Sequence, residues 1–573
     1  MQNYKIFMKI IRFKTIFFVI IACFLISIVR AFCIELLSAK RYKQIYTNDV
    51  DPTVQVQGKR GLIFDSKGKI LATNLFLYDL FIDPKYYLKN QKKIDNTKFL
   101  NFVDKVFNIN IQDIIQENPK KQYINIGILP IKYYHYVKIN IPLGFGLQKL
   151  QERYYPYENT VSHIIGFVDE NGNGVIGVEK QYNMYLEGQK IFEKVYLTPY
   201  GNLNYTKIPQ NGDNIHLTIN ETVQSYLHYL LKSTLKKHKA KMAMGIVMKP
   251  DGAILAMDDV PGYNDNKYYD YTNYSRIKDM PINFLFEPGS VFKIVTMSSA
   301  LNSGIFNGHE TLWCDNGYWP VFGHVIEDVE DNKHLRFDQV FAYSSNVCSA
   351  KIALKENKKI FYKYLWRFGF GKKTGIDLPG EESGIVKDYV NLRPFDLATM
   401  AFGQGISVTQ IQLARAYCAI ANGGYLITPH VLNYISKNHK IIYKYKEHFV
   451  KILKPQTVKK VKHILADVVK YGTGIYAQLK NYSIGGKTGT AQVANGHGGY
   501  SKKKYIGSFV AIFPLNKPRF VILITVVDPK GVNYGGVVAA PYVAKMASFL
   551  AAYYKIPGNN TINNNIKKIA WGQ

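Results

Sequence analysis

The 573-residue sequence has few cysteines, and none of them forms a C-x-x-C pair. They are Cys23, Cys33, Cys314, Cys348 and Cys418. Zinc ribbons need closely spaced ligand pairs, and disulfide-stapled folds need a denser cysteine framework. Two of the five lie in or beside an N-terminal apolar run, and three cannot all pair with one another. We therefore expect neither a metal site nor a fold that depends on disulfides.

Acidic residues are also scarce, with 42 Asp and Glu against 73 Lys and Arg and a net charge of +31. Such an excess favours anionic partners, including nucleic acid, phospholipid surfaces and acidic glycans. The lysines are nevertheless spread along the whole chain, and no arginine-rich arm or recognised nucleic-acid motif occurs. We interpret the charge as compositional bias and expect no nucleic-acid partner.

Long apolar runs are limited to residues 16–29, which follow four basic residues and precede Arg30. A run of 14 residues has the length of a signal-peptide core, whereas a spanning helix needs about 20. If Arg30 snorkels, the run extends through Ile34 to a sufficient length, and residues 29–31 match a cleavage site poorly. We favour a retained signal anchor over a cleaved peptide. By the positive-inside rule, the chain after about residue 38 then lies outside the inner membrane.

The rest of the chain predicts a mixture of strands and helices. With 47% hydrophobic and 20% charged residues it is globular, and its length suggests two to four domains. Hairpins are predicted at residues 60–72, 244–257 and 509–527, where short apolar runs flank turn residues. A helix is expected over residues 542–554, and we place a domain boundary near Asp213.

The tetrad Ser-x-x-Lys brings a lysine amine within one helical turn of a hydroxyl, so a desolvated neutral lysine can accept the serine proton. In this lysine-rich chain the tetrad begins at Ser66, Ser233, Ser275, Ser290 and Ser501. Only Ser290 opens an apolar segment, which predicts a buried helix over residues 290–301. Free N–H groups at a helix start favour a developing anion. Ser290 and Lys293 are therefore the candidate nucleophile and base.

Two further motifs each occur twice. Lys-Thr-Gly at residues 373–375 lies among glycine-rich turns, whereas the copy at residues 487–489 precedes the C-terminal hairpin and predicts a sheet-edge strand open to a peptide. Ser-x-Asn occurs at residues 344–346 and 436–438, both between the tetrad and that strand in the sequence, and we take the first copy as the candidate. Each pattern can arise by chance. The ordered set of three is found in β-lactamases and penicillin-binding proteins.

Longer stretches extend this match. They are EPGSVFK at 287–293, YSSN at 343–346, FGQG at 402–405 and GKTGTA at 486–491, together with Arg60, Gly61, Ile63, Asp65, Arg153, His163, Gly166 and residues 177–179. Over nearly its whole length the chain resembles the class B, monofunctional penicillin-binding proteins. A small departure is Val291, where many members carry Thr, and we expect little effect on the chemistry.

The resemblance implies a mixed α+β protein. Its transpeptidase domain would have the serine penicillin-recognising fold, an antiparallel sheet flanked by helices. One N-terminal transmembrane helix and an elongated α+β pedestal would precede this domain in the sequence. The expected parts are a cytoplasmic tail (1–14), a signal anchor (15–37), a pedestal of the dimerisation type (38–212), the transpeptidase domain (213–556) and a flexible tail (557–573).

It also implies acyl transfer through a covalent serine ester, with neither metal nor cofactor. Ser290 would attack the donor stem peptide and release D-alanine, with Lys293 as general base. Ser344 would relay a proton to the leaving amine, while Lys487 tunes this network and attracts the substrate carboxylate.

The same resemblance assigns the substrate contacts. Asn346 would bind the donor backbone, Thr488 and Thr490 would bind its carboxylate beside Gly489, and backbone N–H groups of Ser290 and Thr490 would form the oxyanion hole. The implied partners are donor (D-Ala-D-Ala) and acceptor stem peptides, β-lactams, the inner membrane and a membrane glycan polymerase.

The alternatives to a septal transpeptidase are an elongation transpeptidase, a β-lactamase and a penicillin sensor. Residues 505–514 and 535–541 resemble the septal enzymes, and no His-Ala-Trp-Phe-like segment follows residue 489, so division is favoured over elongation. A β-lactamase is normally a single soluble domain, and its Glu-x-x-Leu-Asn deacylation signature does not occur in this sequence. A penicillin sensor would need signalling spans or a cytoplasmic domain, which the sequence does not show.

Overall fold

The structure is a computed structural model that describes residues 2–37, 53–90, 96–197, 203–205, 207–271, 276–494 and 499–558. By internal contacts the chain divides into two compact units. One comprises residues 1–59 and 188–212, and the other comprises residues 60–187 and 213–573. The larger unit therefore contains both the N-terminal segments that follow residue 60 and the region of the three motifs.

The smaller unit contains one long helix and one small sheet. Helix α1 (Gln2–Leu37) includes an apolar stretch, Phe13–Phe32, of mean hydropathy 2.6 with none of it buried. Its 20 residues suffice to cross a bilayer at 1.5 Å per residue. Strands β1 (Thr53–Gln57), β6 (Lys190–Leu197) and β7 (Leu203–Tyr205) pair in antiparallel fashion. The N-terminal apolar run is thus a helix of spanning length.

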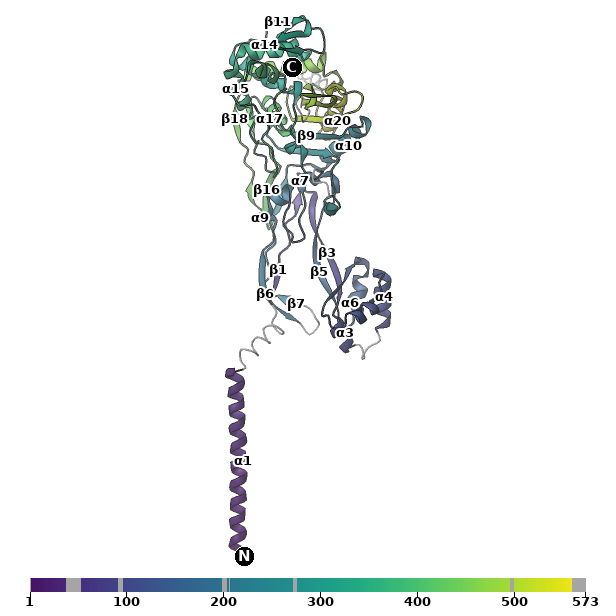
Figure 1. Cartoon of the computed structure of the whole chain (residues 1–573), viewed down its shortest axis with the longest axis vertical. Helices are drawn as coiled ribbons and strands as arrows, with labels where there is room; N and C mark the ends of the chain where they lie inside the picture. The colour runs from purple at the N-terminus through teal and green to yellow at the C-terminus, as the bar shows by residue number, and fades with distance from the viewer. Residues whose placement is uncertain are drawn as a thin grey trace, which may run out of the picture. The chain divides into compact units, whose positions relative to one another are not determined.

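In the larger unit, a long ribbon of strands carries a group of short helices at one end (Figure 1). Strand β3 (Ile70–Ile82) pairs with both β4 (Ile124–Leu129) and β5 (Phe145–Tyr154). The helices are α3 (Pro84–Asn90), α4 (Thr97–Phe107), α5 (Ile111–Glu117) and α6 (Tyr134–Asn140). Leu80, Ile82 and Val103 are fully buried in their common core. The predicted hairpin at residues 60–72 is confirmed by the pairing of β2 (Ile63–Phe64) with β3, although β3 is much longer than expected.

Three buried charged residues join separate segments beside this ribbon. Glu179, on α8 (Gly177–Gln181), accepts hydrogen bonds from Arg60 Nε and Arg153 Nε, both at 2.7 Å. Its side chain is completely buried, and both arginines are at most 8% exposed. Two short helices flank α8, α7 (Ser162–Ile165) and α9 (Asn183–Leu186). A buried carboxylate needs such partners to offset its lost hydration.

Strands from distant parts of the sequence form one mixed sheet. Strand β2 pairs in parallel with β8 (Asn214–Leu217), and β8 pairs with β16 (Leu432–Lys437), which pairs with β17 (Lys440–Lys444). The N-terminal ribbon and the C-terminal region therefore share backbone hydrogen bonds.

The central sheet is antiparallel, in the order β10 (Ile254–Val260), β9 (Met242–Met248), β21 (Phe520–Val527), β20 (Tyr500–Phe513), β19 (Gly485–Ala494). The β9–β10 and β20–β21 hairpins were predicted and are confirmed. Alternate residues of β9 and β21 enter two different hydrophobic cores, so both faces of the sheet are covered. Helices α10 (Glu221–Lys237) and α20 (Ala540–Tyr553) pack on one face, and α17 (Gln410–Ala421) packs on the other.

The remaining elements surround this sheet. The helices are α11 (Met280–Asn283), α12 (Lys293–Ser303), α13 (Phe337–Ala342), α14 (Asn346–Glu356), α15 (Lys358–Arg367), α16 (Pro394–Met400), α18 (Pro455–Lys470) and α19 (Gly535–Val538). The strands are β11 (Thr311–Trp313), β12 (Tyr318–Val321), β13 (His324–Glu327), β14 (His334–Arg336), β15 (Tyr425–Ile427) and β18 (Phe449–Lys451). The 3-10 turns are η2 (Ile131–Tyr133), η3 (Glu158–Thr160), η4 (Asp265–Asp270), η6 (Gly289–Phe292), η7 (Asp315–Gly317) and η8 (Ile475–Ala477).

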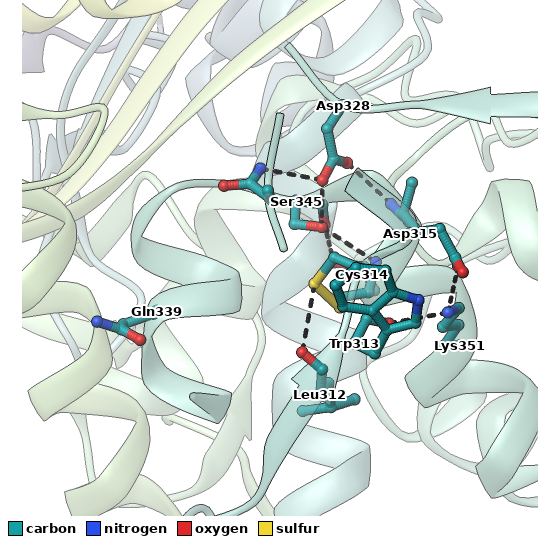
Figure 2. Close-up of a disulfide and its surroundings, with 12 residues drawn as sticks. Leu312, Trp313, Cys314, Asp315, Asp328, Gln339, Ser345 and Lys351 are labelled. Carbon is teal, nitrogen blue, oxygen red and sulfur yellow. Dashed lines mark hydrogen bonds and ion pairs between the residues drawn. A yellow bond between two sulfur atoms is a disulfide. The ribbon is translucent and has the colours of Figure 1, made fainter. Parts of the chain in front are cut away.

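One disulfide joins Cys314 to Cys348, with their Cα atoms 5.2 Å apart (Figure 2). The sequence analysis expected no disulfide framework and did not identify this single pair. Strand β11 ends just before Cys314, and Cys348 lies in the first turn of α14, so the fold brings together two cysteines that are 34 positions apart. Spacing alone does not reveal such a pair. Cys418 is a free, buried thiol and Cys23 is free and exposed.

Candidate active site

Ser290 lies in the turn η6, directly before the buried helix α12. The side chains of Val291, Phe292 and Lys293 are completely buried, whereas Ser290 keeps partial exposure. The predicted helix over residues 290–301 is therefore present as a 3-10 turn followed by an α-helix. Ser290 is the residue of this segment through which a substrate can be reached.

Close backbone contacts hold this turn. Gly289 has φ +56°, and a Cβ there would lie 2.8 Å from the carbonyl oxygen of Thr490. Its N–H donates to the carbonyl of Gly403 at 3.1 Å, and a Cβ on Gly403 would lie 2.1 Å from the carbonyl oxygen of Gly289. Only glycine fits both positions. The FGQG and KTGT segments thus position the backbone next to Ser290.

The amine of Lys293 faces the Ser344–Asn346 turn. It donates to the Ser344 carbonyl at 2.6 Å, to Asn346 Oδ1 at 2.9 Å and to Ser344 Oγ at 3.2 Å. Burial lowers the pKa of Lys293 to about 7, and the charge of Asp328 partly opposes this decrease. A large fraction of this amine is therefore neutral near pH 7 and can accept a proton.

A second buried amine reaches the same hydroxyl. Lys487, on β19, donates to Ser344 Oγ at 2.9 Å and has a completely buried side chain. Burial, and then the positive charge of Lys293, lowers the pKa of Lys487 well below its usual value. Ser344 itself adopts φ +62°, an uncommon conformation for a residue other than glycine. Two lysines from different elements therefore converge on one serine hydroxyl.

The residues after Lys487 follow the edge of the sheet. In the part of the chain that the structure describes, β19 pairs only with β20, so its other edge has no strand partner and is the kind of edge to which a peptide can add. A Cβ on Gly489 would lie 2.9 Å from the carbonyl oxygen of Pro288. The hydroxyl of Thr488 bonds that of Thr473 at 2.7 Å, and the hydroxyl of Thr490 accepts from the Gly535 N–H at 3.1 Å. All predicted site residues thus lie on η6, α12, the turn before α14 with its first residue, and β19, which meet at one place.

The other copies of the motifs lie elsewhere. Ser66 is in an exposed turn, Ser233 is inside α10, and Ser501 Oγ accepts from the N–H groups of Lys503 and Lys504. Ser275 lies outside the described residues.

The second Lys-Thr-Gly and Ser-x-Asn copies have structural roles. Lys373 is exposed, and Thr374 binds Glu381 through its N–H at 2.6 Å and through its hydroxyl. Ser436 Oγ bonds His216 in the mixed sheet at 3.0 Å.

Two carboxylates at the site were not identified from the sequence. Glu287 Oε1 accepts from the Gly405 N–H at 2.9 Å and from the Tyr500 hydroxyl at 3.1 Å. Burial raises the pKa of Glu287. Asp328, in the loop after β13, binds the start of α14. The EPGS stretch contains Glu287 and could have indicated it, whereas no sequence feature distinguishes Asp328 from other loop acids.

Comparison with known proteins gives the family. Residues 243–548 match the family described as "Penicillin binding protein transpeptidase domain", and residues 55–217 match "Penicillin-binding Protein dimerisation domain". The chain belongs to the class B penicillin-binding proteins. This class B protein is accordingly a peptidoglycan D,D-transpeptidase, and the predicted fold class is confirmed.

Relatives in sequence cover almost all of the chain. It is 30% identical to Stage V sporulation protein D of Bacillus subtilis (strain 168) over 98% of this chain and 88% of that protein. It is also 30% identical to Peptidoglycan D,D-transpeptidase FtsI of Buchnera aphidicola, over 96% of both chains, and to the FtsI of Escherichia coli (strain K12), over 85% of this chain and 82% of that protein.

Solved structures show the same fold at lower identity. Penicillin binding protein 3 of Mycobacterium tuberculosis, complexed with aztreonam, has a TM-score of 0.70 at 22% identity and covers 88% of this chain and 98% of its own. Penicillin Binding Protein 2X of Streptococcus thermophilus has a TM-score of 0.75 at 23% identity, over 87% of this chain and 81% of that chain.

Proposed function

We propose that this transpeptidase acts through Ser290, with Lys293, Ser344 and Lys487 moving the protons. The observation that carries the proposal is the convergence of two buried amines on Ser344 Oγ, beside a partly exposed serine. Such a chain of groups can transfer a proton from one end of the reaction to the other.

The contacts of Lys293, Ser344 and Lys487 support the following steps. Neutral Lys293 takes the proton from Ser290 Oγ while that oxygen bonds to the carbonyl carbon of the penultimate D-Ala of a donor stem peptide. The peptide bond then breaks, and the proton reaches the leaving D-alanine amine through Ser344. In the second half, an acceptor amine attacks the ester and loses a proton to the same groups, which restores Ser290.

The substrate would lie along the open edge of β19. Asn346 would bind the substrate backbone. Thr488 and Thr490 would bind the substrate carboxylate, close to the charge of Lys487. Gly489 lies beside them, and its lack of a side chain permits the substrate to approach. The N–H groups of Ser290 and Thr490 would stabilise the oxyanion, where one donor typically contributes about 2.7–4 kcal/mol. β-Lactams would acylate the same serine, as inhibitors that resemble the donor.

Mass spectrometry tests this assignment directly. After incubation with a penicillin and proteolysis, the adduct is expected on the peptide that contains Ser290. An adduct on any other serine would contradict the assignment of the nucleophile.

For the whole chain we propose the parts expected from the sequence, with residues 15–37 as the membrane anchor, 38–212 as the pedestal and 213–556 as the catalytic domain outside the inner membrane. A membrane glycan polymerase would be the partner of the anchor and pedestal. A chain that begins at Ala39 should remain soluble and still be acylated by penicillin. Loss of acylation in a folded protein of that length would mean that the anchor is needed for catalytic geometry.

We further propose a role in cell division. Residues 505–514 and 535–541 resemble the septal enzymes, and elongation is the alternative. The name of the Bacillus subtilis relative adds sporulation as another specialised role. Depletion in the native cell is expected to give filaments or undivided chains, with the protein at mid-cell. Rounded cells that still divide would favour elongation.

A further inference from the structure

Asp328 binds the segment that carries the second catalytic motif. Its Oδ2 accepts from the Ser345 hydroxyl at 2.6 Å, and its Oδ1 accepts from the backbone N–H groups of Val347, at 2.9 Å, and Asn346 (Figure 2 shows Asp328 beside Ser345). These N–H groups belong to the first turn of α14 and have no partner inside the helix. A carboxylate at this position also has a favourable interaction with the helix dipole.

The neighbouring residue fixes the Asn346 side chain. The carbonyl of Glu327 accepts from Asn346 Nδ2 at 3.0 Å, so Oδ1 of the same amide points toward Lys293 and accepts from its amine at 2.9 Å. Asp328 and Glu327 therefore hold both the backbone and the side chain of Asn346. The orientation of that amide decides which of its atoms faces the catalytic lysine.

We propose that Asp328 is a positioning residue for acylation, which holds the Ser344–Ser345–Asn346 turn where Ser344 Oγ meets both lysine amines. This inference rests on the proposed roles of Ser290, Lys293 and Ser344. Asp328 acts through Ser345 and the backbone of α14.

The charge of Asp328 has a second consequence. Among the described residues, Asp328, after β13, is the charged group that shifts the pKa of Lys293, and Lys487, on β19, is a neighbouring amine whose pKa Lys293 lowers. Glu356, at the other end of α14, binds Ser299 Oγ at 2.7 Å, and burial raises its pKa to about 8. Asp328 raises the pKa of Lys293, against the effect of burial. Removal of its charge should therefore lower the pKa of Lys293 further, and the neutral base should persist to lower pH.

Three variants separate positioning from charge. In Asp328→Asn the amide keeps the shape but loses the charge and part of the accepting capacity, whereas Asp328→Glu keeps the charge. Asp338→Asn is the matched control, because Asp338 lies on the neighbouring helix α13 and pairs with the exposed Arg336. The measurement is the second-order rate constant of acylation by a fluorescent penicillin between pH 5.5 and 9, together with the melting temperature of each variant.

For Asp328→Asn we expect a loss of about tenfold or more at the plateau, since hydrogen bonds to a charged acceptor are lost, and a shift of the acidic limb to lower pH. Asp328→Glu should return the acidic limb of the pH profile to its wild-type position. Asp338→Asn should change neither the plateau rate nor the acidic limb. A wild-type rate and limb in Asp328→Asn would overturn the proposal. A reduced plateau rate with an unshifted acidic limb would also overturn the proposal, because that result indicates a structural role only. If Ser290→Ala were still acylated, the proposed function itself would fail, whatever the Asp328 variants do.

Discussion

The amine of Lys487 donates to the hydroxyl of Ser344 at 2.9 Å, although 143 positions separate the two residues. Lys487 is on an edge strand and Ser344 precedes a helix, so only the folded chain brings them together. Lys487 is fully buried and Ser344 is partly buried, and the Lys293 amine contacts the same hydroxyl, so a change at either residue is expected to affect the whole proton path.

Lys487→Ala should therefore reduce acylation by penicillin by about 100-fold or more, since a proton-transfer group and a charge for the carboxylate are both lost. Lys373→Ala is the matched control in the other Lys-Thr-Gly copy, where the lysine is exposed, and it should acylate at the wild-type rate. Acylation rates of purified proteins give the comparison. Similar losses in two folded variants would show that the motif copies had been assigned wrongly.

The pH dependence of acylation follows from the base. Burial lowers the pKa of Lys293 to about 7, and only the neutral amine accepts the serine proton. The rate constant should be nearly constant above about pH 8 and fall roughly tenfold per unit well below pH 7. A rate constant that stays unchanged down to pH 5.5 would exclude Lys293 as the base.

Much of the site could be predicted because its candidate residues lie in short motifs that follow a fixed order in the sequence. Ser290 and Lys487 stand in stretches whose flanking glycines and apolar residues predict their elements, whereas Ser344 was selected only as a member of the set of three motifs. Asp328 could not be found in this way, since it follows the paired strands β12 and β13 and contacts α14 only through the tertiary fold. The Cys314–Cys348 bond was missed for the same reason, because pairing depends on tertiary contacts.

The hairpins could be predicted because short apolar runs with local alternation of apolar and polar residues flank turn residues. The mixed sheet could not be predicted, because β2, β8 and β16 are distant in sequence and each is too short to indicate its partner. The length of β3 was also missed. Its residues 73–79 include Asn74 and Asp79 among apolar ones, and pairing with β5, joined by β4 from Tyr78 onward, keeps them extended.

Glu179 should be essential for stability. Glu179→Ala leaves Arg60 and Arg153 buried without their carboxylate, which typically costs about 3–5 kcal/mol. Glu152→Ala, at an exposed position of β5, should have a free energy of unfolding close to that of the wild type. Urea titration measures both, and equal stability of the two variants would contradict a structural role for the buried network.

The disulfide should stabilise the region around α14. It closes a loop of about 34 residues, for which the chain-entropy relation predicts about 3–4 kcal/mol. Reducing agent should lower the melting temperature of the wild type but leave the double variant Cys314→Ser, Cys348→Ser unchanged. Equal responses of the two proteins would mean that the bond does not form in solution.

If Ser290 is the nucleophile, a fluorescent penicillin should label the protein only while that serine is present. Ser290→Ala should show no covalent label while keeping the wild-type melting temperature, whereas alanine at Ser66, Ser233, Ser275 or Ser501 should leave the label intact. Persistent covalent labelling of folded Ser290→Ala would show that another residue is the nucleophile.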